Sequence, residues 1–312
     1  MRITNHNLQN ARAFVTGASG FIGRHLLAAL TSRGAAISAL QHEQDAGTER
    51  EKTHVGDLSD AIFVKRALAT SAPDFIFHLA AFKERSARIA DFNRALETNL
   101  IGSLNLFSAA ATLPSLKAII VLGTAEEYGP NNSPFIETMR EHPVSAYSYS
   151  KQCMTNLCEI LHHLHGLPIV VLRPTIAYGP GQSTDMFLPA LIRSLLSNRP
   201  FPMTAGRQTR DFVYVSDVVN AILIAATQPG AAGHILNVGS GRPITIENLA
   251  RKVAAITGNA GLLQLGKLPY RQGEVMDYSV DLAKTCSILG WSPQIDFTQG
   301  LAATIDHFRK CD

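Results

Sequence analysis

The sequence predicts an α/β fold, a doubly wound parallel sheet with a smaller C-terminal lobe for binding a substrate. Three observations lead to this prediction. Apolar strand-like runs alternate with helical patterns over the first half of the 312 residues. Glycines 17, 20 and 23 stand between the first such run and the first helix. After Arg173 the alternation gives way to breaks such as Gly179-Pro180-Gly181.

The composition is that of an ordinary globular protein, with 46% hydrophobic and 17% charged residues. Basic residues number 28 and acidic residues 25, with no basic run, so we expect no nucleic-acid partner. No apolar window is long enough for a membrane span, and we expect no membrane association. Arg24 and His25 interrupt the first apolar stretch, which argues against a signal peptide. Four cysteines without C-x-x-C spacing then predict reduced thiols and a cytoplasmic protein: Cys153, Cys158, Cys286 and Cys311.

The first strand, at 13–15, runs into a glycine loop that opens a helix over 21–33. Gly17 permits a tight turn, Gly20 permits close approach of a pyrophosphate, and Gly23 lets the helix pack on the sheet. The first N–H groups of the helix would face the phosphates. The alternative is a turn that keeps glycines for packing alone. A second β-like run at 35–40 favours a Rossmann-type dinucleotide site instead.

The residues that end this second strand bear on the choice of cofactor. Sites for NAD usually carry an acidic residue there to bind the ribose, and this chain has Gln41 and His42. Nothing at these two positions repels a 2′-phosphate, and His42 or Arg24 would approach one. We therefore favour NADP(H), with NAD(H) as the alternative because Glu43 and Asp45 are close.

The next segments continue the alternation. Asp57 ends a strand at 53–55, where it would bind the adenine amino group or cap a helix over 59–70. A strand at 75–79, a helix at 92–111 and a strand at 118–122 follow. Small residues at the end of the 75–79 strand suit a backbone that runs along a flat cofactor. The other residues expected at the cofactor are Ser19, Phe21, Ile22, Leu58, Leu79, Ala80, Ala81 and Asn99.

A candidate catalytic group follows. Tyr147 and Lys151 are four residues apart on a predicted helix and so project from one face. An ammonium beside a phenol favours the phenolate and moves its pKa towards neutral pH. Thr124, just after the 118–122 strand, would donate to the same substrate oxygen.

These motifs together resemble the extended short-chain dehydrogenase/reductases, and more narrowly the NAD-dependent epimerase/dehydratase family that acts on nucleotide sugars. The quoted motifs are Thr16-Gly17-x-x-Gly20-x-x-Gly23, His78-Leu79-Ala80-Ala81, Tyr147-x-x-x-Lys151, Arg210-Asp211-Phe212 and Arg271-x-Gly273-Glu274. The resemblance implies an enzyme in which Tyr147 is the acid–base, Lys151 holds the nicotinamide ribose and Thr124 polarises the sugar oxygen. It also implies a catalytic Glu126 and a substrate site formed by Lys83, Thr124, Arg210, Arg271 and Glu274.

The reaction is less determined than the family. Dehydratases of this group place Asp and Glu after the catalytic threonine, whereas Ala125 and Glu126 stand here. The run Glu126-Glu127-Tyr128-Gly129 looks most like reductases that make GDP-rhamnose from GDP-4-keto-6-deoxymannose. We therefore expect reduction of an NDP-4-keto-6-deoxyhexose, with a 4-epimerase or 4,6-dehydratase as the alternative. A catalytically silent nucleotide-binding scaffold is the competing class.

The resemblance also sets the expected domain organisation. A cofactor domain would span 1–173 and be rejoined by about 211–243, and 174–210 with 244–312 would form the nucleotide-sugar lobe. We expect helices at 184–197, at 216–227 with Ser216 as its cap, at 245–257 with Thr245 as its cap, and at 298–309. A homodimer through the helix that starts near Tyr147 is expected. His162 and His165 have helical metal spacing but no partner, so no metal is expected.

Overall fold

The computed structural model describes residues 8–42, 52–86, 88–271 and 273–311. Its centre is a seven-stranded sheet in the order β11-β6-β5-β4-β1-β2-β3, in which every neighbouring pair is parallel. The strands are β1 (Arg12–Thr16), β2 (Ala36–Gln41), β3 (Lys52–Val55), β4 (Phe75–His78), β5 (Ala118–Leu122), β6 (Ile169–Pro174) and β11 (Ile235–Val238). The predicted doubly wound sheet is confirmed.

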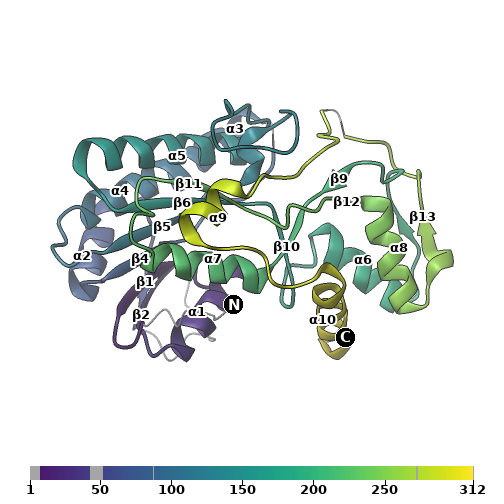
Figure 1. Cartoon of the computed structure of the whole chain (residues 1–312), viewed down its shortest axis with the longest axis horizontal. Coiled ribbons are helices and arrows are strands. Elements are labelled where there is room, and N and C mark those ends of the chain that lie inside the picture. The colour runs from purple at the N-terminus through teal and green to yellow at the C-terminus, as the bar shows by residue number, and fades with distance from the viewer. Residues whose placement is uncertain (1–7, 43–51, 87, 272, 312) are drawn as a thin grey trace.

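Helices cover both faces of this sheet, as Figure 1 shows. One face packs against α1 (Phe21–Ser32) and α7 (Val215–Thr227), and the other against α2 (Ala61–Ser71), α4 (Gly102–Ala110) and α5 (Ala146–His165). Alternation along β1 divides the two cores: Val15 belongs to the first and Phe14 to the second. Because both faces are covered, strands such as β5 read as continuous apolar runs.

In the structure, the helix predicted over 92–111 is divided into three segments. The α3 helix (Ile89–Leu96) passes into a π-helical turn, η1 (Glu97–Ile101), before α4 begins at Gly102. The wider turn places Asn99 in the interior with only 1% of its surface exposed. Apolar periodicity gives no sign of such a turn, so the single helix was the wrong prediction.

A smaller region lies on the right of Figure 1, beyond the end of the sheet. It contains α6 (Phe187–Leu196), α8 (Ile246–Thr257), α10 (Phe297–Cys311), the short turn η3 (Ala260–Leu262), and the paired β8 (Phe201–Pro202) and β13 (Leu263–Gln264). Two short ladders connect it to the sheet: β7 (Ile176–Tyr178) with β10 (Phe212–Tyr214), and β9 (Thr209–Arg210) with β12 (Ile244–Thr245). The α9 helix (Ala283–Leu289) returns to the first core.

Two predicted helix caps have opposite outcomes. Thr245 accepts a hydrogen bond from the Asn248 backbone N–H at 3.1 Å, as expected of a cap. Ser216 was the wrong choice, because α7 already begins at Val215 and Tyr214 is its cap residue. Glu43 and Asp45, the acidic residues that kept NAD(H) as the alternative, lie outside the described residues. Within the described ranges, no helix is both long and apolar enough to cross a membrane.

Candidate active site

The glycine loop joins β1 to α1 at the carboxyl edge of the sheet. Gly17 has φ of +72°, and a Cβ there would lie 2.6 Å from the Ala80 backbone nitrogen. A Cβ on Gly23 would meet the carbonyl oxygens of Gly17 and Ala18. Gly23 therefore lets the first turn of α1 close on the loop itself. Packing of this helix on the sheet, the reason predicted from the sequence, is a separate contact and stays a prediction.

The open end of α1 is suited to an anion. Its cap residue, Gly20, has no side chain to accept the first N–H groups. Ser19 is exposed, while Phe21 and Ile22 are half-buried beside the loop. A glycine cradle with free backbone donors at a helix N-terminus fits the pyrophosphate of a dinucleotide.

A buried polar chain fixes the wall of this site. His78 Nδ1 lies 2.7 Å from Thr16 Oγ1, and its Nε2 lies 2.8 Å from Ser103 Oγ. The Ala80 backbone N–H donates to Thr16 Oγ1 at 3.2 Å. Burial lowers the pKa of His78 to about 3, so the ring is neutral and structural. These hydrogen bonds place the backbone of Leu79 and Ala80 against Gly17.

Asn99 reinforces the same wall. Its carbonyl oxygen accepts from the Phe82 N–H at 2.7 Å, and its amide donates to the Phe82 carbonyl and to Ser150 Oγ at 2.8 Å. The side chain joins the segment after β4 to α5. Because its amide is used within the protein, Asn99 supports the predicted cofactor site from behind. Ala81 is half-buried in that segment.

The other end of the predicted cofactor site lies past β2. His42 Nδ1 lies 3.6 Å from the Asp57 carboxylate, so the side chain expected to approach a 2′-phosphate already faces an acidic residue. Asp57 also accepts from the Ser59 N–H at 2.8 Å. Asp60, which accepts from two N–H groups, caps α2 in place of Asp57. Gln41 and Leu58 are buried, at 4% and 5% exposure.

Three of the four predicted catalytic residues lie on two neighbouring elements. Thr124 follows β5, and Tyr147 and Lys151 occupy the first turns of α5, which Ser145 caps. The Thr124 side chain is one of the groups that act on the Tyr147 phenol, and it lowers the pKa of that phenol. Lys151 is 2% exposed, and its ammonium donates to the Leu122 carbonyl at 2.6 Å.

The electrostatics of this group differ from the prediction. Burial, and then the Glu126 carboxylate, raise the pKa of Tyr147 above its ordinary value, although a lowered pKa was expected from Lys151. Burial is the largest cause and outweighs the pKa-lowering effect of the nearby Arg85 cation. Burial lowers the pKa of Lys151 to about 8.

The two glutamates after Ala125 have different partners. Glu127 is fully buried, accepts from the Thr124 N–H at 2.9 Å and forms an ion pair with the buried Arg173 at 2.7 Å. Glu126 forms an ion pair with Arg85 at 2.8 Å, and the Arg85 guanidinium lies 5.4 Å from the centre of the Tyr147 ring. Glu127 is therefore structural, and Glu126 belongs to the reactive group.

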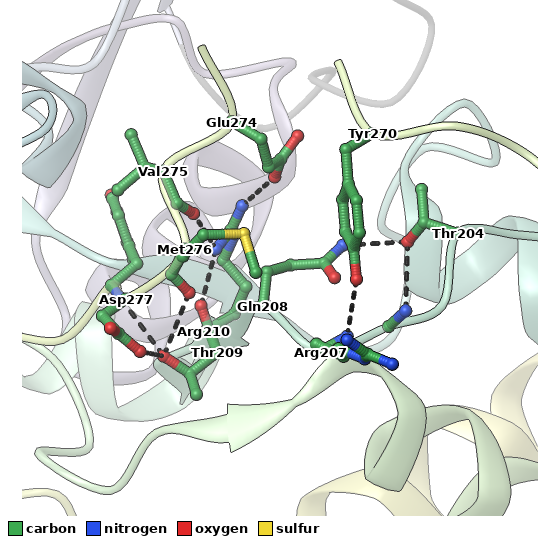
Figure 2. Close-up of polar contacts among 12 residues, drawn as sticks. Thr204, Arg207, Gln208, Thr209, Arg210, Tyr270, Glu274, Val275, Met276 and Asp277 are labelled. Carbon is green, nitrogen blue, oxygen red and sulfur yellow. Dashed lines mark hydrogen bonds and ion pairs between the residues drawn. The ribbon is translucent and has the colours of Figure 1, made fainter. Parts of the chain in front are cut away.

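The predicted substrate residues Arg210 and Glu274 are brought together, as Figure 2 shows. The Arg210 guanidinium forms an ion pair with Glu274 and donates to the carbonyls of Thr209 and Val275 at 2.6 and 2.8 Å. Arg271 is exposed, and its backbone carbonyl accepts from the Glu274 N–H. Burial, and then the nearby Arg85, lower the pKa of Lys83, which lies in the segment after β4.

Sequence reasoning missed Tyr278. It is 7% exposed, the Arg210 guanidinium lies 5.8 Å from its ring, and burial raises its pKa well above the ordinary value. Glu126 and Tyr147 contribute to that shift. Tyr278 thus lies between the predicted phosphate-binding arginine and the reactive group. No local motif surrounds it that would reveal this position.

The histidine pair on α5 has an ordinary role. His162 Nδ1 lies 2.8 Å from the Leu167 carbonyl oxygen. Across the described ranges, no group of three or more His, Cys, Asp or Glu side chains is placed to hold a metal ion.

The family follows from a match along most of the chain. Residues 13–239 match the model of the NAD dependent epimerase/dehydratase family. The chain belongs to this family. It is therefore an enzyme of the extended short-chain dehydrogenase/reductase class, as the motifs predicted.

Relatives of this chain are similar over nearly their whole length. A dTDP-glucose 4,6-dehydratase of Xanthomonas campestris pv. campestris is 29% identical, over 94% of this chain and 92% of the relative. A UDP-glucose 4-epimerase of Mycolicibacterium smegmatis is 30% identical, over 96% and 99%. The solved UDP-glucose 4-epimerase of Thermotoga maritima, with UDP-glucose, is 28% identical with a TM-score of 0.89, over 96% and 99% of the two chains.

Proposed function

We propose that the protein is a nucleotide-sugar 4-epimerase that works with bound NAD. The observation that carries this proposal is the Arg85–Glu126 ion pair beside Tyr147, with the buried Ala125 next to it. Elimination of water from a sugar needs an acid that protonates the departing hydroxyl. Both oxygens of the Glu126 carboxylate already accept from the Arg85 guanidinium, and an alanine carries no acidic group. Epimerisation, which oxidises and then reduces the same carbon, does not need an acid for a departing hydroxyl.

The roles of the reactive residues follow from their contacts. Tyr147 would take the proton of the sugar 4-hydroxyl and later return it, since it is the acidic group that Thr124 contacts. Thr124 would donate to the same oxygen. The Lys151 ammonium would stabilise the phenolate form of Tyr147 that accepts this proton. NAD, when bound, supplies the hydride acceptor and donor.

We propose that the smaller region, 174–210 and 244–312, holds the nucleotide. The Arg210 guanidinium, assisted by the exposed Arg271, fits phosphate oxygens, and Glu274 would orient Arg210. Lys83 lies on the sugar side, near Arg85. The solved relative that binds UDP-glucose supports this assignment.

NAD is our choice of cofactor over NADP. The family is NAD-dependent. The Asp57 carboxylate, 3.6 Å from His42, would repel a 2′-phosphate at that edge. The Asp57 carboxylate thereby offsets the absence of an acidic residue at position 41, which favoured NADP(H).

The expected 4-keto reductase has less support. The matched relatives named above are a dehydratase and 4-epimerases. The Glu126-Glu127-Tyr128 run that favoured a reductase has a structural explanation in part, since Glu127 pairs with Arg173 and Tyr128 donates to Asn237 at 2.9 Å. These contacts carry no information on the reaction.

The test is product analysis by NMR after incubation of the protein and NAD with UDP-, dTDP-, GDP- and CDP-hexoses. We expect inversion at C4 with no net formation of NADH. A product that has lost one water would support a dehydratase instead. Stoichiometric NADPH oxidation with 4-keto-6-deoxyhexoses would support the reductase. No turnover of any of them would support the silent scaffold.

We also propose a homodimer through α5. Large apolar side chains are exposed on one face of α5 and on the neighbouring turn: Tyr149, Ile160 and Leu164, with Ile101 and Leu104. Leu164, 65% exposed, is the most open of the five. Leu164→Asp should convert the dimer to a monomer in light scattering, and a monomeric wild type would contradict this.

The described cysteines are free thiols, which supports the expected cytoplasmic location.

A further inference from the structure

Arg85 and Glu126 come from different parts of the chain and meet at the reactive phenol. Arg85 lies in the segment after β4, and Glu126 lies two residues beyond Thr124. The guanidinium donates through Nε to both carboxylate oxygens, at 2.8 and 3.1 Å. Burial opposes its charge, but the Glu126 carboxylate outweighs that effect and raises the pKa of Arg85.

Ligands have access to the Arg85–Glu126 ion pair but not to the nearby Arg173–Glu127 ion pair. Arg173 and Glu127 are both fully buried, so no ligand reaches them. The side chains of Arg85 and Glu126 are 43% and 29% exposed. Their remaining donors and acceptor lone pairs are therefore available near the ring of Tyr147, whose centre lies 5.4 Å from the Arg85 guanidinium.

We infer that Arg85 and Glu126 recognise a free, neutral hydroxyl on the sugar next to the carbon that is oxidised. This assignment rests on the proposed function, which places that carbon at Tyr147 and Thr124. A hydroxyl accepts from the guanidinium and donates to the carboxylate at once. The substrate class is therefore a nucleotide-linked neutral hexose, and the pair is the specificity determinant.

The same geometry disfavours two other classes of sugar. A carboxylate in that position would gain Arg85 but face the like charge of Glu126. A methyl group or hydrogen in that position would displace water from the Arg85–Glu126 ion pair. It would not replace the hydrogen bonds that the water made. Sites that hydrogen-bond a substrate hydroxyl discriminate strongly against the analogue that lacks it.

The experiment compares kcat/KM for C4 epimerisation among four nucleotide sugars with one base: the hexose, its 6-deoxy and 3-deoxy analogues, and the uronate. For the wild type, we expect kcat/KM to fall by about 10- to 100-fold for one deoxy analogue. Arg85→Met should reduce that penalty to less than about threefold. If the penalised analogue is the 6-deoxy sugar, the uronate should fall with it, because its carboxylate then replaces the recognised hydroxyl, and Glu126→Gln should raise the uronate-to-hexose ratio at least about tenfold by removing the repelling charge.

A matched control is Arg251→Met, which removes an exposed pair with the same 2.8 Å separation on α8. It should leave all ratios unchanged. NAD affinity and the thermal midpoint of each variant show that folding is retained. Equal use of all four sugars by the wild type, or unchanged ratios in both site variants, would overturn the inference while leaving the epimerase intact. Absence of C4 chemistry with every sugar would overturn the proposed function, and the inference with it.

Discussion

The ammonium of Lys151 donates a hydrogen bond to the carbonyl oxygen of Leu122, 2.6 Å away at the end of β5. The contact ties the start of α5 to the strand that leads into Thr124. It keeps a cation inside the protein, only four residues along the helix from Tyr147.

A pH dependence follows from this burial. The pKa of Lys151 is lowered to about 8, while that of Tyr147 is raised, so the lysine loses its proton first as pH rises. We expect kcat/KM to fall as pH rises through about 8, because a neutral amine no longer stabilises the phenolate form of Tyr147 that accepts the substrate proton. A pH–rate profile checks this, and Lys151→Met should abolish that alkaline limb along with most activity. A profile that stays flat to pH 10 would contradict the assignment.

Removal of the phenolic hydroxyl should separate chemistry from binding. Tyr147→Phe should lower kcat by about 10²- to 10⁴-fold, the usual contribution of a positioned acid–base. The ring and its contact with Arg85 remain, so NAD affinity should stay within about threefold of wild type. Steady-state kinetics and calorimetric titration with NAD measure the two effects. Tyr149→Phe, on the exposed side of α5, is the control.

The glycine loop gives a prediction about cofactor binding alone. Gly23→Ala should weaken NAD binding at least about tenfold, or 1.4 kcal/mol, because the new methyl group displaces the carbonyls of Gly17 and Ala18. Gly261→Ala is a matched change, since its Cβ meets no atom within 4 Å. Fluorescence titration with NADH compares the two variants. Equal affinities would show that the loop tolerates the displacement.

The buried ion pair predicts a stability effect. Glu127→Gln leaves the Arg173 cation with Glu141 alone, so the free energy of unfolding should fall by about 3 kcal/mol. Glu247→Gln, in the exposed pair on α8, should leave stability close to wild type. Urea denaturation followed by circular dichroism measures both. A small effect for Glu127→Gln would mean that Glu141 takes over the charge.

Arg210 allows a test of phosphate binding. Arg210→Met should raise KM for the nucleotide sugar about tenfold or more with a smaller change in kcat, because the contact lies away from the reacting carbon. Inhibition by free UDP should weaken to the same extent. If kcat falls and KM is unchanged, Arg210 acts on the reactive group through Tyr278 instead.

The sequence predicted those features that depend on local spacing. The glycine loop, the strand alternation and the pair at Tyr147 and Lys151 are each contained in one short segment. What it could not predict depends on register between distant segments. Arg85 and Glu126 are 41 residues apart, and His42 and Asp57 meet only when β2 and β3 are paired. The backbone forms a π-helical turn at Asn99, and the hydrogen bonds of Asn99 with Phe82 and Ser150 stabilise it. The apolar periodicity of the sequence does not predict such a turn.

The position of β11 at the edge of the sheet has a consequence for synthesis. This strand, Ile235–Val238, pairs with β6 only after the chain has built α6 and α7. A nascent chain that ends before residue 235 therefore presents the buried apolar strand β6 as an unpaired edge, a template for aggregation. Expression of 1–173 alone should for this reason yield insoluble material, whereas a fragment that adds the chain through α9 can close the sheet.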